Sequence, residues 1–404
     1  MNEVGPADQS RDFRARTWPL DPANVSTGLP LEGLRVLDLS RVLAGPLCAM
    51  IAGDLGADVI KVESPTGDPV RSLAPPRFGN DATYFLSVNR HRRNVCADLT
   101  NPSDYDRVHE LFMVADAVVE NFLPHQSASL GLLSWREERP DCVWVSVTSA
   151  ATNGPLARDP SFDLLAQARS GLMSVTGTAD GEPTKVGAPV ADVVTGLYGA
   201  IGLVTGLYAR AVGRPGRHFE APLLESTITI LTNQVQGALA THVSPQRLAN
   251  HHPSIAPYGP IHCRDGDILV AVATDSQFAA LVNVLGDLRL TDRIEFATND
   301  VRVTQRSDLC RVLDEICGEN TVEFWLERFA GSKVPYAPIL DVLEALDQPQ
   351  IRDGDFVGTV TLPAGELATL KSPLRIDGIR PDIRTAPRRL GQDNEVLGFN
   401  SRDE

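Results

Sequence analysis

From residue 31 onward, the chain alternates short runs of β-branched residues with stretches whose apolar residues recur at helical spacing. Such alternation is typical of a parallel sheet whose strands are joined by crossover helices. We therefore predict an α/β fold with a Rossmann-like, doubly wound large domain. Helices are expected after Gly45-Pro46 and over 105–114, and the expected strands are 35–39, 58–62, 94–97, 117–119 and 143–147.

The 404 residues are too many for one compact core. Turn residues gather at 213–216, and a second set of elements follows, with a helix near 225–239, a strand at 267–272 and helical patterns over 277–285 and 307–317. We predict a flexible N-terminal arm (1–30), a large domain built from 31–215 and 335–404, and a smaller α+β domain with linkers over 216–334. The Pro- and Arg-rich tail over 372–397 is expected to pack back on the large domain.

Charge and cysteine content limit the classes of partner. Acidic residues outnumber basic ones by 52 to 37, and the net charge of −15 disfavours nucleic acids and anionic membranes as partners. The six cysteines include no CxxC pair and have no histidine placed to complete a metal site, which favours reduced thiols in a cytoplasmic protein. The first thirty residues lack the apolar core of a signal peptide.

One uncharged run, 193–209, approaches the length of a membrane span. Its glycines, at 196, 199, 202 and 206, recur every three or four residues and form one smooth helical face. This spacing favours a helix buried in the core or in a subunit interface over a span.

In open α/β sheets, ligands bind beyond the carboxyl ends of the strands. The loops at these ends are 40–44, 63–68, 97–100, 120–123 and 147–150. The chain contains no GxGxxG or Walker sequence, which counts against the usual dinucleotide and P-loop modes of binding.

The segment 161–172, which follows Gly154-Pro155, sets Asp163 where a loop turns into a helix. The positive field of a helix N-terminus favours the ionised carboxylate, which could act as a nucleophile. Aspartate is also a preferred N-cap residue, so a purely structural role is the alternative.

Several motifs resemble class III CoA-transferases, the family that includes formyl-CoA transferase, carnitine CoA-transferase and alpha-methylacyl-CoA racemase. The similarity runs in the family's order from about Leu31 to about Leu397. Its motifs are residues 31–39 with Ala44-Gly45-Pro46, residues 55–63, 84–90 and 119–122, the Asp163 segment, Val334-Pro335 and residues 390–397.

The resemblance implies an enzyme that binds CoA as an interlocked homodimer and needs no metal or redox cofactor. Asp163 aligns with the catalytic aspartate of the family. In the family mechanism, this carboxylate attacks an acyl-CoA thioester and forms a mixed anhydride. The CoA thiolate then attacks the aspartyl carbonyl, which gives an aspartyl-CoA thioester, and an acceptor acid reverses the sequence.

By the same alignment, CoA contacts are expected from the strand-end loops. Ser64, Ser129 and Thr148 stand where the formyl-CoA transferase pattern has basic residues, so arginines nearby would supply the missing charge. The segment 148–153 also replaces a Gly-aromatic-Gly sequence of many relatives. The expected contacts are Arg41, Leu43, Ala44, Arg71, Arg92, Arg93, Ala97, Thr100, Asn121, Phe122, Leu123, Thr148, Ser149 and Ala150.

The segment 252–258 occupies the place of a lid over the site. It resembles the version in relatives that act on succinyl-CoA and other dicarboxylic acids, which favours succinyl-CoA as the donor. The residues expected to face the substrate are His252, Pro253, Ser254 and Tyr258.

Two alternatives to a transferase remain open. The racemase branch of the family uses an aspartate and a histidine, but no histidine lies between Gly131 and Asp163, and His125 is the closest one upstream. A catalytically silent CoA-binding scaffold would keep the fold without turnover.

Overall fold

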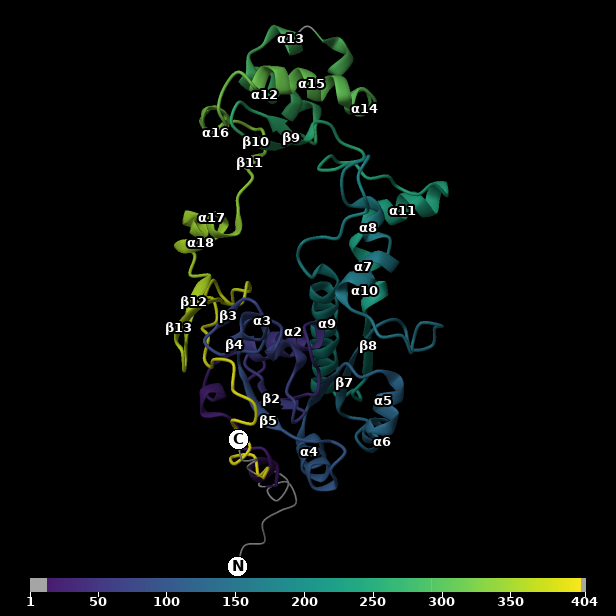
Figure 1. Ribbon diagram of the computed structural model, residues 1–404, viewed down its shortest axis with the longest axis vertical. Coiled ribbons are helices and arrows are strands. Elements are labelled where there is room, and N and C mark those ends of the chain that lie inside the picture. Colours follow the sequence, from purple (N-terminus) through teal and green to yellow (C-terminus); the bar gives the residue numbers. More distant parts are fainter. Residues whose placement is uncertain (1–12, 292, 401–404) are drawn as a thin grey trace, which may run out of the picture. The chain divides into compact units, whose positions relative to one another are not determined.

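The computed structural model describes residues 13–291 and 293–400. Its central element is a sheet of six parallel strands in the spatial order β5-β2-β1-β6-β7-β8 (Figure 1). This order winds outward in both directions from β1, as in Rossmann-like folds, so the predicted α/β fold with a parallel sheet is confirmed. The strands are β1 (Arg35–Asp38), β2 (Asp58–Glu63), β5 (Arg92–Cys96), β6 (Ala117–Glu120), β7 (Val143–Thr148) and β8 (His218–Pro222).

Helices cover both faces of this sheet, and every residue of β1, β2, β5, β6 and β7 is buried, as in a parallel sheet that is covered on both sides. On one face, α2 (Ala44–Asp54) and α9 (Val190–Ala211) pack against valines of β1, β2 and β7. On the other face, α4 (Pro102–Val114) and α6 (Leu132–Glu138) bury Trp135 against the sheet. Further helices of this large unit are α3 (Thr83–Val88), α5 (Pro124–Ser129), α7 (Asp163–Arg169) and α10 (Leu223–Ile230).

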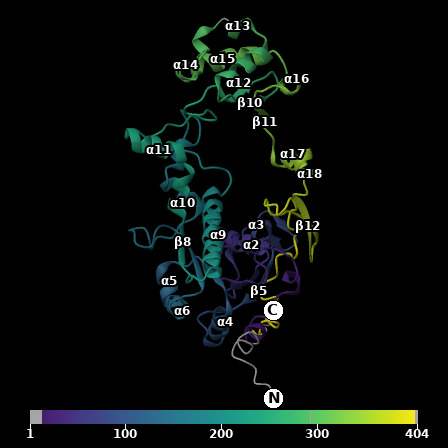
Figure 2. The same cartoon turned by 180° about the vertical axis from the view of Figure 1, so that it is seen from behind.

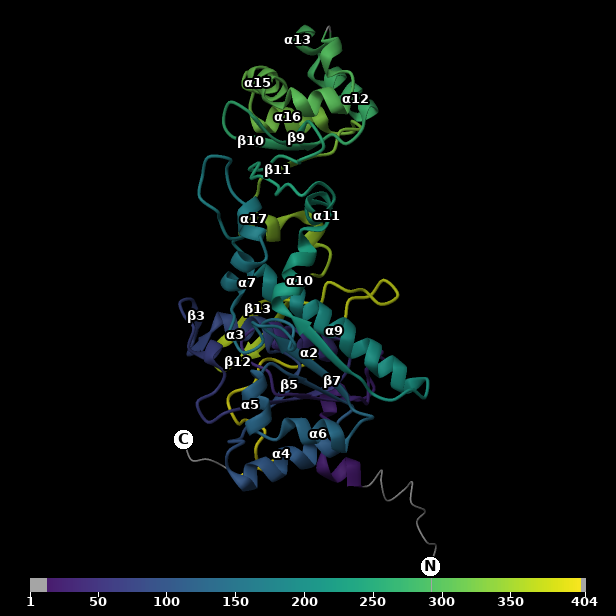
Figure 3. The ribbon, with the colours of Figure 1, turned by 90° about the vertical axis from the view of Figure 1, so that its right-hand side faces the viewer.

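The glycine stripe of α9 faces α2 and the sheet, and Figures 2 and 3 show this helix beside β7 and β8. A Cβ on Gly196 would lie 2.7 Å from the carbonyl oxygen of Ala44, and one on Gly206 would lie 2.5 Å from Cγ1 of Val143. The missing side chains therefore allow the close approach that the sequence suggested. In length and composition α9 would suffice to cross a membrane, but 56% of its most apolar window is buried inside the protein.

The N-terminal arm departs from its expectation where the structure describes it. Residues 1–12 lie outside the described residues, but Trp18 is fully buried in the core. Its Nε1 donates to Oδ2 of Asp58 at 3.2 Å, and Asn24 donates to Oδ1 of the same carboxylate. The expectation of a loose arm is therefore wrong for residues 13–30, because a single tryptophan supplied the apolar surface that anchors them.

The chain divides into two compact units whose boundaries differ from the predicted ones. The small unit comprises residues 173–185 and 237–348, and the large unit comprises the rest. Residues 216–236 join the large unit because β8 extends its sheet, and residues 335–348 join the small unit because β11 pairs with β10.

The small unit has a three-stranded antiparallel sheet in the order β11-β10-β9 with helices packed around one apolar core. Its strands are β9 (Tyr258–His262), β10 (Asp267–Ala271) and β11 (Tyr336–Pro338). Its helices are α12 (Asp275–Leu285), α13 (Leu288–Thr291), α14 (Asn299–Thr304), α15 (Arg306–Cys317), α16 (Val322–Phe329) and α17 (Val342–Asp347), while α8 (Leu172–Val175) and α11 (Thr232–Thr241) lie at the unit boundaries.

The C-terminal segment belongs to the large unit. After α18 (Pro349–Arg352), it forms the hairpin β12 (Val357–Leu362) and β13 (Gly365–Leu370). The tail then packs along β5, where Asn94 N donates to Oδ2 of Asp393 and Cys96 N donates to Oδ1 of Asn394, both at 2.8 Å. The expected return of the tail to the large unit is therefore seen.

Candidate active site

Asp163 is the first residue of α7, but its carboxylate does not cap that helix. Oδ1 instead accepts the backbone N–H of Ala191 at 2.8 Å and that of Asp192 at 3.4 Å, both in the first turn of α9. Oδ2 accepts Nε2 of Gln167 at 2.6 Å. The carboxylate of Asp163 thus lies at the N-terminus of α9, a helix about thirty residues further along the chain.

Gln167 fixes the orientation of the Asp163 carboxylate. Its side chain is fully buried, and its Oε1 accepts the N–H of Val186 at 2.9 Å, which leaves Nε2 to face Asp163. The two N–H groups of α9 that bind Oδ1 lie at the positive end of a 22-residue helix, which also favours a negative charge there. Asp163 itself is only partly buried, so the arrangement holds an anion in place without enclosing it.

Two other acidic groups lie close to Asp163. Burial raises the pKa of Asp192 to about 7, and the charge of Asp163 adds to this shift. Burial also raises the pKa of Tyr84 to about 12, with further contributions from Asp192 and Asp163. Tyr84 packs against the apolar cluster of Leu43, Met50 and Val88, which includes the residue that precedes α2 in one of the predicted strand-end loops.

The loops after β1 and β6 meet at the point where the sheet order reverses, and they bring three predicted contacts together. Arg41 N donates to Oδ1 of Asn121 at 2.9 Å, and Asn121 Nδ2 donates to the carbonyl oxygen of Arg41 at 2.7 Å. The guanidinium of Arg41 lies 5.3 Å from the centre of the Phe122 ring. Within residues 13–291 and 293–400, no carboxylate pairs with this guanidinium, so its charge is free for a ligand at the switch point of the sheet.

The other three predicted arginines are already paired within the large unit. Arg92 and Arg93 are buried and bind Asp38 and Asp58, each at 2.8 Å. Arg71 forms two hydrogen bonds with Glu63, at 2.7 and 2.8 Å, and stacks on a phenyl ring. A buried guanidinium that already faces a carboxylate is poorly placed to neutralise a phosphate. The surroundings of Arg92 and Arg93 therefore do not favour contact with CoA, whereas a CoA contact of Arg71, whose side chain is 17% exposed, stays a prediction.

The segment that follows β7 carries two unsatisfied hydroxyl groups. Oγ1 of Thr148 and Oγ of Ser149 are buried without a hydrogen-bond partner. Ala150 is buried beside them, and the segment is tied to α10 where Leu224 N donates to the carbonyl oxygen of Ser149 at 3.2 Å. Buried hydroxyls usually form hydrogen bonds, so these two groups could donate to or accept from a bound molecule.

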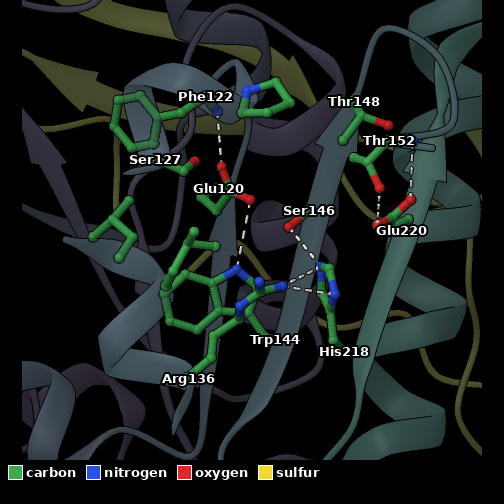
Figure 4. Close-up of a pocket in the computed structure, with 13 residues that line it drawn as sticks. Glu120, Phe122, Ser127, Arg136, Trp144, Ser146, Thr148, Thr152, His218 and Glu220 are labelled. Carbon is green, nitrogen blue, oxygen red and sulfur yellow. Dashed lines mark hydrogen bonds between the residues drawn. The ribbon is translucent and has the colours of Figure 1, made fainter. Parts of the chain in front are cut away.

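Thr148 and Phe122 also line a cavity of about 150 Å³ on one face of β6, β7 and β8 (Figure 4). At its wall, Glu120 accepts the N–H of Phe122 at 2.8 Å, and burial raises the pKa of this carboxyl group. Arg136 reaches into the same space and hydrogen-bonds the ring of His218 at 2.7 Å. The cavity therefore holds a cation that the sequence did not single out.

The remaining predicted contacts lie in or beside the loops that follow the strands. Leu43 and Ala44 are buried at the start of α2, and Ala97 N donates to the carbonyl oxygen of Glu63. Thr100 is exposed and bonds Asp98. Leu123 precedes α5, where its N–H donates to Gln126. Whether these residues bind CoA stays a prediction.

The predicted lid belongs to the small unit and is held there by several bonds. Nη2 of Arg306 donates to the carbonyl oxygens of His252 and Pro253, and Nδ1 of His252 accepts the N–H of Ser254 at 3.0 Å. The rings of His252 and Tyr258 lie 5.2 Å apart. His252, Pro253 and Ser254 thus lie in one loop and Tyr258 begins β9, and the role of this segment as a lid stays a prediction.

Four residues near the site were not predicted from the sequence: Gln167, Asp192, Tyr84 and Arg136. A signal was present for two of them, because Gln167 lies one helical turn after Asp163 and Asp192 opens the glycine-rich run. Among the described residues, no group of three or more His, Cys, Asp or Glu side chains could hold a metal ion.

Comparison with known proteins gives one consistent result. Residues 31–394 match the model of CoA-transferase family III. The human succinyl-CoA:glutarate CoA-transferase is 34% identical, over 92% of this chain and 87% of that protein. The succinate–glutarate CoA-transferase of Agrobacterium fabrum is 33% identical, over 88% of this chain and 93% of its own length.

A solved structure agrees with these matches. The crystal structure of a CAIB/BAIF family protein from Brucella suis has a TM-score of 0.81 and 34% sequence identity, and the match covers 92% of this chain and 98% of that one. The transferase names of the relatives favour a transferase over the racemase and the silent scaffold. The chain therefore belongs to CoA-transferase family III, enzymes that move coenzyme A from an acyl-CoA to a carboxylic acid.

Proposed function

We propose that this chain transfers CoA from succinyl-CoA to a second dicarboxylic acid, with Asp163 as the nucleophile. The observation that carries the proposal is the position of the Asp163 carboxylate, which is held by two N–H groups of α9 and by the amide of Gln167. An oriented carboxylate that remains partly exposed meets the first requirement of covalent catalysis.

The same donors suit the second step. One oxygen of Asp163 forms the bond to the acyl group, and the electron pair of the broken C–S bond goes to the CoA sulfur. When the thiolate attacks the aspartyl carbonyl, negative charge develops on the other oxygen. The N–H groups of Ala191 and Asp192 point at Oδ1 and would stabilise this charge, as an oxyanion hole does.

We further propose that CoA lies along the strand ends from Arg41 to the segment after β7. Arg41 offers an unpaired charge and Phe122 an aromatic surface beside it. The buried hydroxyls of Thr148 and Ser149 offer hydrogen bonds, and Arg136 adds a second cation near Phe122. This arrangement would replace the basic residues that are absent at Ser64 and Ser129.

The choice of succinyl-CoA rests on two supports, the lid sequence and the substrates in the names of the human and Agrobacterium relatives. Glutarate is the first acceptor to test for the same reason. Acetyl-CoA is the contrasting donor, because it lacks the second carboxylate.

The test is intact-mass spectrometry after the protein is mixed with succinyl-CoA. The expected result is a covalent adduct that hydroxylamine removes and that peptide mapping assigns to Asp163. Asp163→Asn should form none. The matched control is Asp159→Asn, which makes the same change on an exposed carboxylate four residues earlier, where it faces Arg169 at 3.3 Å.

This control should keep the adduct and the transfer of CoA to glutarate. If Asp163→Asn forms the adduct as fast as the wild type does, Asp163 is not the nucleophile. If no donor in a panel of acyl-CoA thioesters labels the wild type, the proposed chemistry is wrong for this chain.

We also propose that the active form is an interlocked homodimer. The outer face of α9 is apolar and exposed, with exposed fractions of 45% for Leu197, 61% for Ile201 and 68% for Tyr208. An apolar helix face of this kind is typical of an interface. Ile201→Lys should lower the mass measured by light scattering, whereas Leu288→Lys, at an exposed leucine of the small unit, should not.

Finally, we propose a cytoplasmic location. All six cysteines are free thiols in the structure, and Cys48, Cys96, Cys142 and Cys317 are buried. Thiols that persist unpaired are typical of a reducing compartment. Fractionation of the native host, with the protein detected by antibody, would test this.

A further inference from the structure

Asp192 places a second carboxyl group beside Asp163. It is the third residue of α9, and its backbone nitrogen lies 3.4 Å from Oδ1 of Asp163. Its exposed fraction is only 9%. Across residues 13–291 and 293–400, no hydrogen bond or ion pair reaches its carboxyl oxygens. Burial beside an anion without a cationic partner favours the neutral form of a carboxyl group.

Burial shifts the pKa of Asp192, and Asp163 carries the charge that adds to this shift. Burial and the Asp163 charge together raise its pKa to about 7. The charges of both carboxyl groups also act on Tyr84, whose pKa is raised to about 12 by burial first and then by these charges, so the phenol stays neutral. The other titratable or charged side chains on elements packed against α9 are Arg169 on α7, Cys48 and Asp54 on α2, Glu225 on α10, and His218 and Glu220 on β8.

The inference rests on the proposed function, because it concerns the sulfur that attacks Asp163. To form the aspartyl-CoA thioester, the CoA sulfur must come within bonding distance of the Asp163 carboxyl carbon. The first turn of α9, which carries Asp192, contacts that carboxyl group directly. We propose that Asp192 exchanges a proton with the CoA sulfur during the reaction of Asp163.

The step balances as follows. As an oxygen of Asp163 bonds to the acyl carbon, the C–S bond breaks, and the sulfur takes the electron pair together with the proton of Asp192. The products are the Asp163 anhydride, a neutral CoA thiol and an ionised Asp192. The thiol then returns the proton to Asp192 as its sulfur attacks the aspartyl carbonyl, and the donor acid leaves as a carboxylate.

This exchange keeps one negative charge in the site throughout. Before the reaction the charge is on Asp163, and in the anhydride it is on Asp192. Acylation removes the Asp163 charge that opposed ionisation of Asp192, so Asp192 becomes a stronger acid as the thiolate forms. A thiol of ordinary pKa, roughly 8.5, accepts the proton from such an acid.

The first test compares Asp192→Asn with the wild type over pH 5.5–9, with CoA transfer from succinyl-CoA to glutarate as the readout. Asparagine keeps the size of the side chain but has no proton to exchange. Because general acid–base groups contribute about 10²–10⁴-fold, kcat should fall by at least about 100-fold. The wild-type kcat/KM should decline as pH rises through about 7, since the acid form of Asp192 is lost, and Asp192→Asn should lack this decline.

Two further variants separate this role from its alternatives. Asp192→Glu should restore part of the activity and the decline with pH. Tyr84→Phe should retain the decline, because the phenol does not titrate in this range. A slow Asp163 adduct in Asp192→Asn would show that the proposed function holds even where the proton exchange is lost.

Two outcomes would overturn the inference. In one, Asp192→Asn keeps kcat within about threefold of the wild type with an unchanged pH profile. The other uses the unmodified protein and so does not depend on a variant that folds. Infrared difference spectroscopy should detect a protonated carboxyl band that disappears around pH 7 and titrates at lower pH in Asp163→Asn. A wild type without such a band does not hold the proton that the step requires.

Discussion

Gly206→Ala is the sharpest test of how α9 packs on the sheet. The added Cβ would lie 2.5 Å from Cγ1 and 2.9 Å from Cγ2 of Val143, and 3.0 Å from Cε2 of Phe219. Ordinary contact begins at 3.4 Å, so the helix or the strand would have to move by roughly 1 Å. Val143 is fully buried and β-branched, so its side chain cannot rotate away without leaving its preferred rotamer.

The expected change in the free energy of unfolding is the cost of overpacking minus the gain from a better helix-forming residue. Overpacking a core costs about 1–3 kcal/mol, and the contact at Gly206 belongs at the upper end of that range. Replacing glycine by alanine inside a helix contributes about 1 kcal/mol in the opposite direction. The free energy of unfolding should therefore fall by roughly 2 kcal/mol.

The assay is urea unfolding followed by circular dichroism, with Gly237→Ala as the matched control. Gly237 also lies within a helix, α11, but a Cβ there would meet no atom within 4 Å. The control should be more stable than the wild type by up to about 1 kcal/mol. Val143→Ala combined with Gly206→Ala should recover part of the loss, which a double-mutant cycle measures. If Gly206→Ala is as stable as the wild type, the close approach of α9 to β7 is wrong.

Three further predictions concern a buried ion pair, a buried histidine and a surface cation. Asp68→Asn should lower the free energy of unfolding by about 3 kcal/mol, because it removes the counter-charge that lies 3.0 Å from the buried Lys61. Urea unfolding measures this loss, and a value below about 0.5 kcal/mol would contradict the prediction. Burial holds the pKa of His91 well below its usual value. Below about pH 6.5 the unfolded chain therefore binds a proton at His91 that the folded chain does not bind. The free energy of unfolding should fall by up to about 1.4 kcal/mol for each pH unit of acidification. In His91→Asn, this dependence on pH should be weaker. Arg41→Met should raise the KM for succinyl-CoA about tenfold, as expected for a lost contact to phosphate, and an unchanged KM in initial-rate measurements would exclude Arg41 from the CoA site.

The strands of the sheet were predictable because they are buried on both faces. A run such as 143–147 is apolar enough to be recognised without knowledge of its neighbours. β8 was missed because it is an edge strand in which polar residues and a proline are tolerated. The helix expected over 225–239 is broken at Thr232, which has a φ of 33°. The residues around it gave no signal of this positive φ.

The predicted site was resolved unevenly. Asp163 could be singled out because local sequence carries the loop-to-helix junction and the family motif. The roles of the arginines could not be separated, because their partners are distant in the chain. Arg93 binds a carboxylate 35 residues away, whereas Arg41 pairs with no carboxylate among the described residues. The residues next to these two arginines in the sequence do not indicate which one is paired.

The sequence by itself determined the parallel α/β sheet, the glycine face of α9 and the identity of the candidate nucleophile, because each is recorded in residues close together along the chain. The tertiary structure decided what surrounds that nucleophile. It brought the start of α9, 28 residues downstream, to Oδ1 of Asp163 and set Asp192 beside it. Charge and hydrogen bonding in a site depend on distance in space, and only the packing of α7 against α9 fixes those distances.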